Sequence, residues 1–127
     1  MPAKFTIKVE GIEKVNAYIG EKKVAIMKAI KTGVNKAGLF IEGEVKESIS
    51  GHRPEKRSVD TGNFLRSPTT KMTSDSSVEV YSDTPYAKHL EFGTSRMNPR
   101  WHFRNTKARN EKKVQDFIKN EIKQATS

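Results

Sequence analysis

The chain of 127 residues contains no cysteine, which excludes disulfide bonds and zinc sites built on thiolates. It has no apolar run near the roughly 20 residues that a membrane-spanning helix needs. Its first residues, MPAKFTIKVEG, include no apolar segment of the kind found in secretion signals. We therefore expect a soluble protein that is made in the cytoplasm and has no membrane partner.

Acidic residues are also few, because 15 Asp and Glu stand against 24 Lys and Arg and leave a net charge of +9. Such an excess favours encounters with polyanions, although a solvated lysine-rich surface explains it equally well. Hydrophobic residues make up 34% of the chain and include six Phe, three Tyr and one Trp. This is enough for one modest core, so we expect a single domain over residues 1–127.

The first third of the chain predicts a strand followed by helices. Phe5, Ile7 and Val9 alternate with polar residues, which indicates a half-buried strand that ends at Gly11. Helical spacing then runs over residues 12–19. From Glu21, apolar residues recur every three or four positions and predict an amphipathic helix of about 25 residues. These positions are Val24, Met27, Ile30, Val34, Ala37, Ile41, Val45 and Ile49.

Three glycines, Gly33, Gly38 and Gly43, lie inside this predicted helix at five-residue spacing. Each glycine costs about 1 kcal/mol relative to alanine in a helix interior. We expect that these positions allow close packing of the helix against a sheet or a neighbouring helix.

The remainder predicts a loop, two strands and a last helix. Residues 48–63 are polar and contain Gly and Pro, so we expect an exposed loop that is mobile over about residues 50–62. Residues 63–83, NFLRSPTTKMTSDSSVEVYSD, predict two strands joined by the SDSS turn, and Pro68 places the first of them at an edge or a bulge. The segment between Pro85 and Pro99 predicts a loop with a short helix over residues 87–92. Helical spacing predicts a terminal helix over residues 105–123 from Val114, Phe117, Ile118, Ile122 and Ala125.

This order of elements predicts an α+β fold, in which a small antiparallel sheet packs against one long helix and a C-terminal helix.

Residues 84–106, TPYAKHLEFGTSRMNPRWHFRNT, are the richest in chemically active side chains. His89, Glu91 and His102 are the candidates for acid–base chemistry, but His89 and Glu91 point apart if the segment is helical. The chain has no HExxH motif, no nucleophilic serine motif and no paired carboxylates, and its basic loop lacks the order of a phosphate-binding loop. We therefore expect no catalytic residue, no metal site and no cofactor.

The same segment favours binding, because aromatic residues alternate with arginines. Rings that stack on bases and arginines that contact phosphates are typical of nucleic-acid binders. Aromatic residues and arginine are also enriched in protein interfaces, so side-chain chemistry alone does not distinguish a nucleic-acid-binding surface from a protein interface. The residues concerned are Tyr86, Phe92, Arg96, Arg100, Trp101, Phe103 and Arg104.

The order of residues in this segment resembles the signature of the head–tail joining, or tail-completion, proteins of long-tailed bacteriophages. That signature has Tyr-Ala, then Glu-Phe-Gly-Thr, then an aromatic segment that leads into the last helix. The sequence matches it at Tyr86, Ala87, Glu91, Phe92, Gly93 and Thr94, and supplies Arg100, Trp101 and Phe103 in an altered order. The segment VDTGNFLRS resembles a second element of the family, with one extra residue, through Thr61, Gly62, Leu65 and Arg66.

The resemblance implies a non-enzymatic virion protein at the neck or tail that forms rings and is assembled in the host cytoplasm. It implies partners such as the tail tube or tail terminator, a head-completion protein and further copies of the chain, with possible non-specific contact with packaged DNA. The alternative from the residues alone is a small basic nucleic-acid-binding protein, or a nuclease or toxin.

Elementary physical chemistry gives the matched residues structural roles. We expect positive φ at Gly93 and a turn closed by the Thr94 hydroxyl. We expect Tyr86 and Phe92 to anchor the segment to the sheet. Glu91 is expected to accept backbone N–H bonds or to pair with Arg66 or Arg100.

Overall fold

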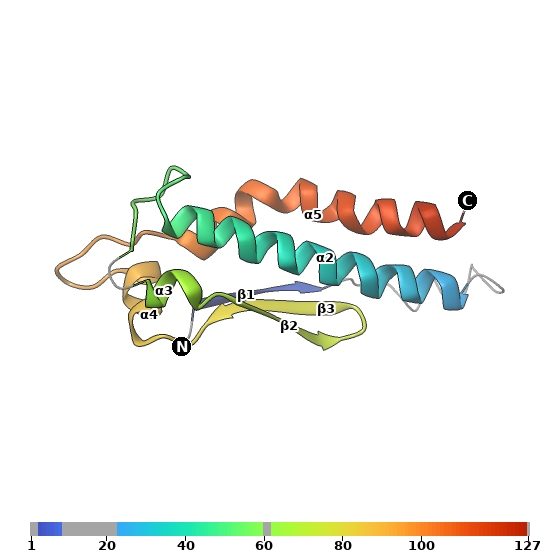
Figure 1. Ribbon diagram of the computed structural model, residues 1–127, viewed down its shortest axis with the longest axis horizontal. Coiled ribbons are helices and arrows are strands. Elements are labelled where there is room, and N and C mark those ends of the chain that lie inside the picture. The colour runs from blue at the N-terminus through green and yellow to red at the C-terminus, as the bar shows by residue number, and fades with distance from the viewer. Residues whose placement is uncertain (1–2, 9–22, 60–61, 127) are drawn as a thin grey trace.

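A three-stranded antiparallel sheet forms one layer of the fold, and two long helices that run in opposite directions form the other (Figure 1). The computed structural model describes residues 3–8, 23–59 and 62–126. This is the predicted α+β class. The elements are β1 (Ala3–Lys8), α2 (Lys23–Ile49), α3 (Asn63–Arg66), β2 (Thr69–Ser74), β3 (Ser77–Ser82), α4 (Pro85–Phe92) and α5 (His102–Thr126).

The strand β3 lies in the middle of the sheet, between β1 and β2. Val78 and Val80 of β3 are fully buried, as their alternation with polar neighbours predicted. β2 is an edge strand that starts just after Pro68, and its register shifts between Met72 and Ser74, in agreement with the edge position that this proline predicted. β1 forms the predicted strand, whereas Val9, Gly11 and the helical spacing over 12–19 lie outside the described residues.

The buried stripe of α2 differs from the prediction at its start. Val24 is 78% exposed and Met27 is only half-buried, whereas Ile26 is buried. Each helical residue turns the side chain by about 100°, so Val24 points away from the face that Ile26 and Ile30 share. The stripe therefore consists of Ile26, Ile30, Val34, Ala37, Ile41, Val45 and Ile49.

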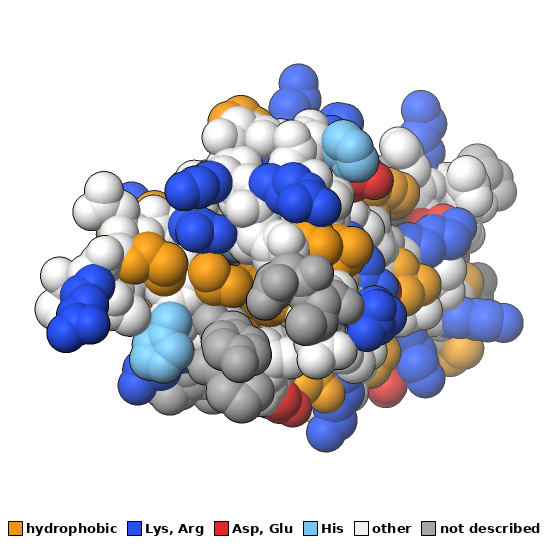
Figure 2. Space-filling model, turned by 60° about the vertical axis from the view of Figure 1, so that its left-hand side comes forward, with side chains coloured by type: hydrophobic (Ala, Val, Ile, Leu, Met, Phe, Trp, Pro, Cys, Tyr) orange, Lys and Arg blue, Asp and Glu red, His pale blue; other side chains and the backbone are white. Residues whose placement is uncertain are grey.

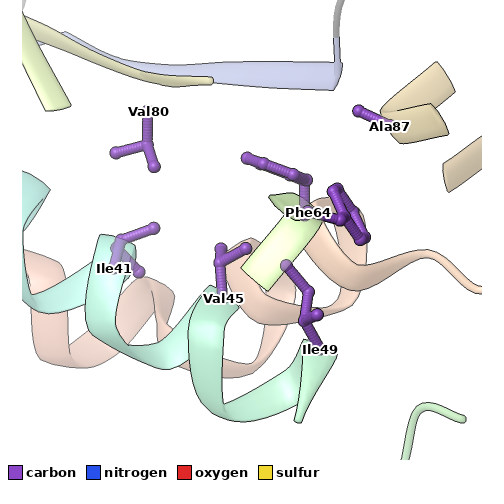
Figure 3. Close-up of a cluster of buried hydrophobic side chains, with 7 residues drawn as sticks. Ile41, Val45, Ile49, Phe64, Val80 and Ala87 are labelled. Carbon is purple, nitrogen blue, oxygen red and sulfur yellow. The ribbon is translucent and has the colours of Figure 1, made fainter. Parts of the chain in front are cut away.

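Two hydrophobic clusters join the layers. The cluster shown in Figure 3 gathers side chains from α2, α3, β3, α4 and α5 at the end of the molecule where α3 and α4 lie. The other cluster joins the first half of α2 to Val78, with Ile118 and Ile122 of α5 packed against it. The first cluster consists of Ile41, Val45, Ile49, Phe64, Val80, Ala87 and Phe103.

Three boundaries differ from the sequence-based expectations. Residues 63–66, which we expected to begin a strand, form the helical turn α3 after Gly62, whose φ of 86° reverses the chain. α4 begins at Pro85, where the fixed φ of proline suits the first turn of a helix. α5 extends the predicted helix at both ends and begins at His102.

None of the helices in the described ranges combines the length and the apolar character that crossing a bilayer requires.

Two of the three glycines of α2 lie at close contacts. A Cβ atom at Gly33 would lie 2.9 Å from the Cα of Ile118, and one at Gly38 would lie 2.8 Å from methyl groups of Thr70 and Val78. These contacts confirm the expected packing against α5 and the sheet. A Cβ at Gly43 would meet no atom within 4 Å, so the packing explanation is wrong for that glycine.

We predict that Gly33→Ala and Gly43→Ala change stability in opposite directions. Gly43→Ala is expected to raise the free energy of unfolding by about 0.5–1 kcal/mol, because alanine restricts the unfolded chain and is a better helix former. Gly33→Ala is expected to lower it by about 1–3 kcal/mol, because the backbone of α5 must move. Urea unfolding of both variants measures the difference, and a shared sign would contradict this packing.

Candidate functional site

The matched motif forms a rigid corner between α4 and α5. Gly93 ends α4 with φ 78° and ψ 178°, a combination open almost only to glycine. A Cβ there would lie 2.7 Å from both Met97 O and Pro99 N. The Thr94 hydroxyl accepts a hydrogen bond of 3.1 Å from the Arg96 N–H. The positive φ of Gly93 and the turn closed by Thr94 are therefore confirmed.

Glu91 connects this corner to the start of α5. Its carboxylate is 3% exposed and accepts hydrogen bonds of 2.9 Å from the backbone N–H groups of Phe103 and Arg104. These N–H groups belong to the first turn of α5, which has no helical partners for them and which favours a negative charge. Burial raises the pKa of Glu91 above its ordinary value, although the two N–H donors act against this rise. Of the two expected roles, the structure shows backbone capping.

The segment after Gly93 folds back onto α4. Thr94 and Met97 form a small antiparallel bridge, and the N–H of Arg100 donates to Leu90 O at 2.9 Å. Trp101 has a φ of 54°, the only positive value among the described residues other than glycine. Its N–H donates to Glu91 O at 3.3 Å. Backbone contacts therefore hold residues 94–101 as a closed loop, hereafter the corner loop.

The aromatic residues of the motif are split between core and surface. Phe103 is buried in the core cluster, whereas Phe92 is 48% exposed. The expected anchoring of Phe92 to the sheet is therefore wrong: Ala87 and Glu91 form the inner face of α4, and Phe92 follows Glu91 by one residue, about 100° around the helix. The Phe92 ring instead makes a T-shaped contact with the Trp101 ring, with 5.8 Å between centroids and 85° between the ring planes. The side chain of Tyr86 lies outside the described part.

Arg104 covers one face of the Trp101 ring. Its guanidinium carbon lies 4.6 Å from the ring centroid, within the range of a cation–π interaction. A ring contact and a cation–π contact therefore hold Phe92, Trp101 and Arg104 together as a cluster at the surface.

A buried polar network lies beside the corner and connects the loop after α2 to α5. His102 is fully buried, and its Nδ1 lies 2.7 Å from Ser48 Oγ while its Nε2 lies 2.8 Å from Ser58 Oγ. The Ser48 hydroxyl donates to Glu55 Oε1 at 2.6 Å. Arg109 donates to both carboxylate oxygens of Glu55 at 3.0 Å. We call these residues, with Arg100, the His102 network.

The protons of this network follow from its hydrogen bonds. A carboxylate only accepts, so the single Ser48 proton goes to Glu55 and Ser48 Oγ accepts from His102 Nδ1–H. His102 Nε2 is then free to accept from Ser58, whose oxygen also receives a 2.7 Å bond from Arg100. We therefore assign the neutral tautomer of His102 with its proton on Nδ1.

The charges of the network agree with this assignment. Burial lowers the pKa of His102 to about 4, despite the attraction of nearby Glu55. Burial alone would raise the pKa of Glu55, but the hydrogen bonds from Arg109 and Ser48 outweigh it and lower the pKa to about 2. At neutral pH, Glu55 is a carboxylate and His102 is uncharged.

The Ser58–His102 pair has the composition of a nucleophile and base, but its environment favours a structural role. A base whose conjugate acid has a pKa of about 4 removes a hydroxyl proton poorly. The partner of His102 Nδ1 is a serine rather than a carboxylate. Within the described residues, no group of three His, Asp or Glu is placed to hold a metal ion. The network instead fixes the loop after α2 onto α5.

The loop expected over residues 50–62 is mostly exposed, but Glu55 is buried within it. Sequence reasoning missed Ser48, Glu55 and Ser58, because their partners His102 and Arg109 lie 44 to 54 positions away in the chain. The polar run itself gave no signal of a buried carboxylate. The mobility of this loop stays a prediction.

The other predicted residues lie near the corner or outside the described part. His89 is exposed whereas Glu91 is buried, as the helical spacing required. Gly62 has positive φ, and Leu65 packs partly buried against the core cluster. Arg66 is exposed and donates to Asn63 Oδ1 at 3.0 Å. Thr61 lies outside the described residues.

A protein-family model with the description "Bacteriophage HK97-gp10, putative tail-component" matches residues 13–93, which is more than half of the chain. The match includes Glu91 and ends at Gly93. No curated protein and no solved structure gives a significant match to the chain.

We predict that the Glu91 cap contributes strongly to stability. Glu91→Ala is expected to lower the free energy of unfolding by about 2–4 kcal/mol, because two N–H groups at the start of α5 lose their acceptor. Glu91→Gln keeps one acceptor oxygen and is expected to cost about half as much. Glu111→Gln, an exposed change on α5, is the control for urea unfolding. A loss no larger for Glu91→Ala than for the control would exclude the cap.

We further predict that His102 makes stability depend on pH. Its folded pKa of about 4 lies below the ordinary histidine pKa of 6.5, so the unfolded chain binds more protons between these values. The stabilisation is complete above pH 6.5 and is lost as the pH falls toward 4. Between pH 6.5 and 4.5 the free energy of unfolding is expected to fall by about 2–3 kcal/mol.

His102→Asn is expected to remove this slope, and His89→Asn, at an exposed position, to keep it. The window above pH 4.5 excludes most of the contribution of Glu55, whose carboxyl has a lowered pKa. The raised pKa of Glu91 contributes with the opposite sign, but it is common to both variants. Equal slopes in the two variants would contradict the buried neutral histidine.

Proposed function

Because the chain belongs to the HK97-gp10-like family of phage tail components, which is a head–tail joining and tail-completion family, we propose that it completes the tail at the head–tail joint. In this proposal one domain over residues 1–127 acts without catalysis, through contacts with other virion proteins in the neck. The family match over residues 13–93 is the observation that carries the proposal.

The geometry of the corner supports a role in assembly rather than in chemistry. The buried motif residue Glu91 caps α5, and Gly93 makes the turn that starts the corner loop. Beside Glu91 and Gly93, the exposed side chains are Phe92 and Arg104, and both contact the half-buried Trp101 ring. Aromatic residues and arginine are the types that protein interfaces enrich at their centres.

We propose that copies form a ring in the particle, whereas the isolated chain is a monomer or a mixture at moderate salt. Each copy carries a net charge of +9, which opposes self-association in solution. In the described ranges, the large exposed apolar side chains are Val24, Leu39 and Phe92, which lie far apart along the chain. In the particle, contacts with a partner protein provide the attraction that copies of the chain lack for one another in solution.

Nucleic-acid binding is supported less well. The net charge favours it, and contact with packaged DNA inside a ring is compatible with the proposal. Base stacking, however, needs a free aromatic face. Arg104 covers one face of Trp101, and Phe92 makes a T-shaped contact with the same ring.

We predict that a phage with a nonsense codon in this gene accumulates filled heads and separate tails that fail to join, or tails of abnormal length. Complementation with the wild-type chain is expected to restore the titre, and complementation with Trp101→Ala to restore it only in part. Leu39→Ala, at an exposed apolar position on α2, is the control. Electron microscopy and plaque counts provide the measurement, and normal infectious particles from the nonsense mutant would exclude the proposal.

A further inference from the structure

Two hollows lie side by side at the end of the molecule that carries the corner loop. The first has a volume of about 470 Å³ and is lined by residues of the loop after α2, of α3 and α4, and of the corner loop. Its apolar part consists of Val59, Phe64, Leu90 and Met97, and polar residues that include His89, Arg57 and Arg100 complete the lining.

The second hollow, of about 550 Å³, is polar. It is lined by Lys56, Arg96, Asn98 and Asn105, among others. Met97 and Arg100 line both hollows, so the two hollows adjoin at the corner loop.

The cations of this surface have no acidic partner in the parts of the chain that the structure describes. Lys56, Arg57 and Arg96 form no ion pair there, and Arg100 donates to Arg57 O and Ser58 Oγ. The acidic residue of the second hollow, Glu55, is buried and engaged with Arg109. Figure 2, turned toward this end, shows many basic side chains among apolar ones and few carboxylates. The surface therefore attracts negative charge.

We propose that the two hollows bind an acidic segment of another virion protein. One apolar side chain of that segment enters the first hollow, and adjacent carboxylates lie against Arg96, Arg100 and Lys56. The proposal rests on the proposed function only for the location of the partner in the virion. Paired apolar and charged contacts of this kind give both affinity and orientation.

Other occupants fit less well. A second copy of the chain would bring another net charge of +9 to a basic surface. Duplex DNA offers phosphates for the second hollow, but it has no apolar side chain for the first one. An acidic protein segment satisfies both hollows.

Two residues in the walls of the hollows are held before any partner arrives. Ser58, beside Arg57, is fixed by His102 and Arg100, and Met97 is fixed by its backbone bridge to Thr94. A preorganised surface needs little ordering on binding, so more of the contact energy appears as affinity.

The test uses heads and tails isolated from cells infected with the nonsense mutant, to which the purified full chain is added. The protein concentration that gives half-maximal joining is measured by plaque counts. Arg96→Glu and Met97→Asp are each expected to raise this concentration about tenfold or more. The matched controls are Lys119→Glu and Leu39→Asp, at exposed positions away from both hollows, and they are expected to stay within about threefold of wild type.

Melting temperatures confirm that each variant is folded, and Met97→Ala replaces Met97→Asp if the latter is not. If the wild-type chain restores no joining, the proposed function fails. If it restores joining and both hollow variants act like wild type, this inference alone is overturned. Binding to a short DNA duplex is measured in parallel by fluorescence anisotropy at two salt concentrations. Loss of DNA binding in Arg96→Glu, together with normal joining by Met97→Asp, would assign the surface to DNA and overturn it as well.

Discussion

The contact on which the rest of this end of the molecule depends is the Glu91 carboxylate at the start of α5. Its two oxygens accept hydrogen bonds from two N–H groups that have no partner within the helix, which allows α5 to begin at His102. Because Glu91 belongs to α4, the same contact fixes α4 against α5. The corner loop between them then has both ends held, and Phe103 is directed into the core cluster. One buried carboxylate thus sets a helix boundary, a loop conformation and a core position.

The His102 network adds a second connection, between the loop after α2 and α5. The network limits the cost of burying polar groups, because the buried carboxylate of Glu55 is paired with Arg109, while His102 stays neutral. The two serines act as relays that satisfy both nitrogens of the ring. An imidazole in this position joins two segments about 50 residues apart in the chain, at the point where Arg57 and Arg100 reach the surface. The network therefore has a mechanical consequence for the neighbouring hollows even though it performs no reaction.

Sequence patterns predicted what depends on local periodicity. The stripe of α2 from Ile30 onward, the alternation of β3 and the turn at Gly93 all follow from residues close together in the chain. The predictions failed where a residue distant in the chain determines the local structure. α5 starts early because of a carboxylate 11 residues upstream, and Glu55 is buried because Arg109 and Ser48 enclose it. Phe92 was expected to anchor its segment to the sheet, whereas its position on α4, one residue after Glu91, turns it outward. No local pattern predicted the hollows, since five separate segments line them: the loop after α2, α3, α4, the corner loop and α5.

The family match covers most of the framework and part of the surface that carries the hollows. The matched range ends at Gly93 and contains α2, α3, β2, β3, α4 and the Glu91 carboxylate, whereas β1 precedes it and α5 follows it. Met97 and Arg100, which line both hollows, and Arg96, which lines the second, lie just beyond it in the corner loop, whereas other lining residues such as Lys56 and Leu90 lie within it. This loop is held at both ends by backbone hydrogen bonds that do not depend on its side chains. Thr94 and Arg100 also contribute side-chain hydrogen bonds, with the Arg96 N–H and with Ser58 Oγ, so Arg96 and Met97 are the positions of the loop where a change costs the fold least. A tail component built in this way keeps one framework, while a change at Arg96 or Met97 alters the hollows that we propose as its binding surface.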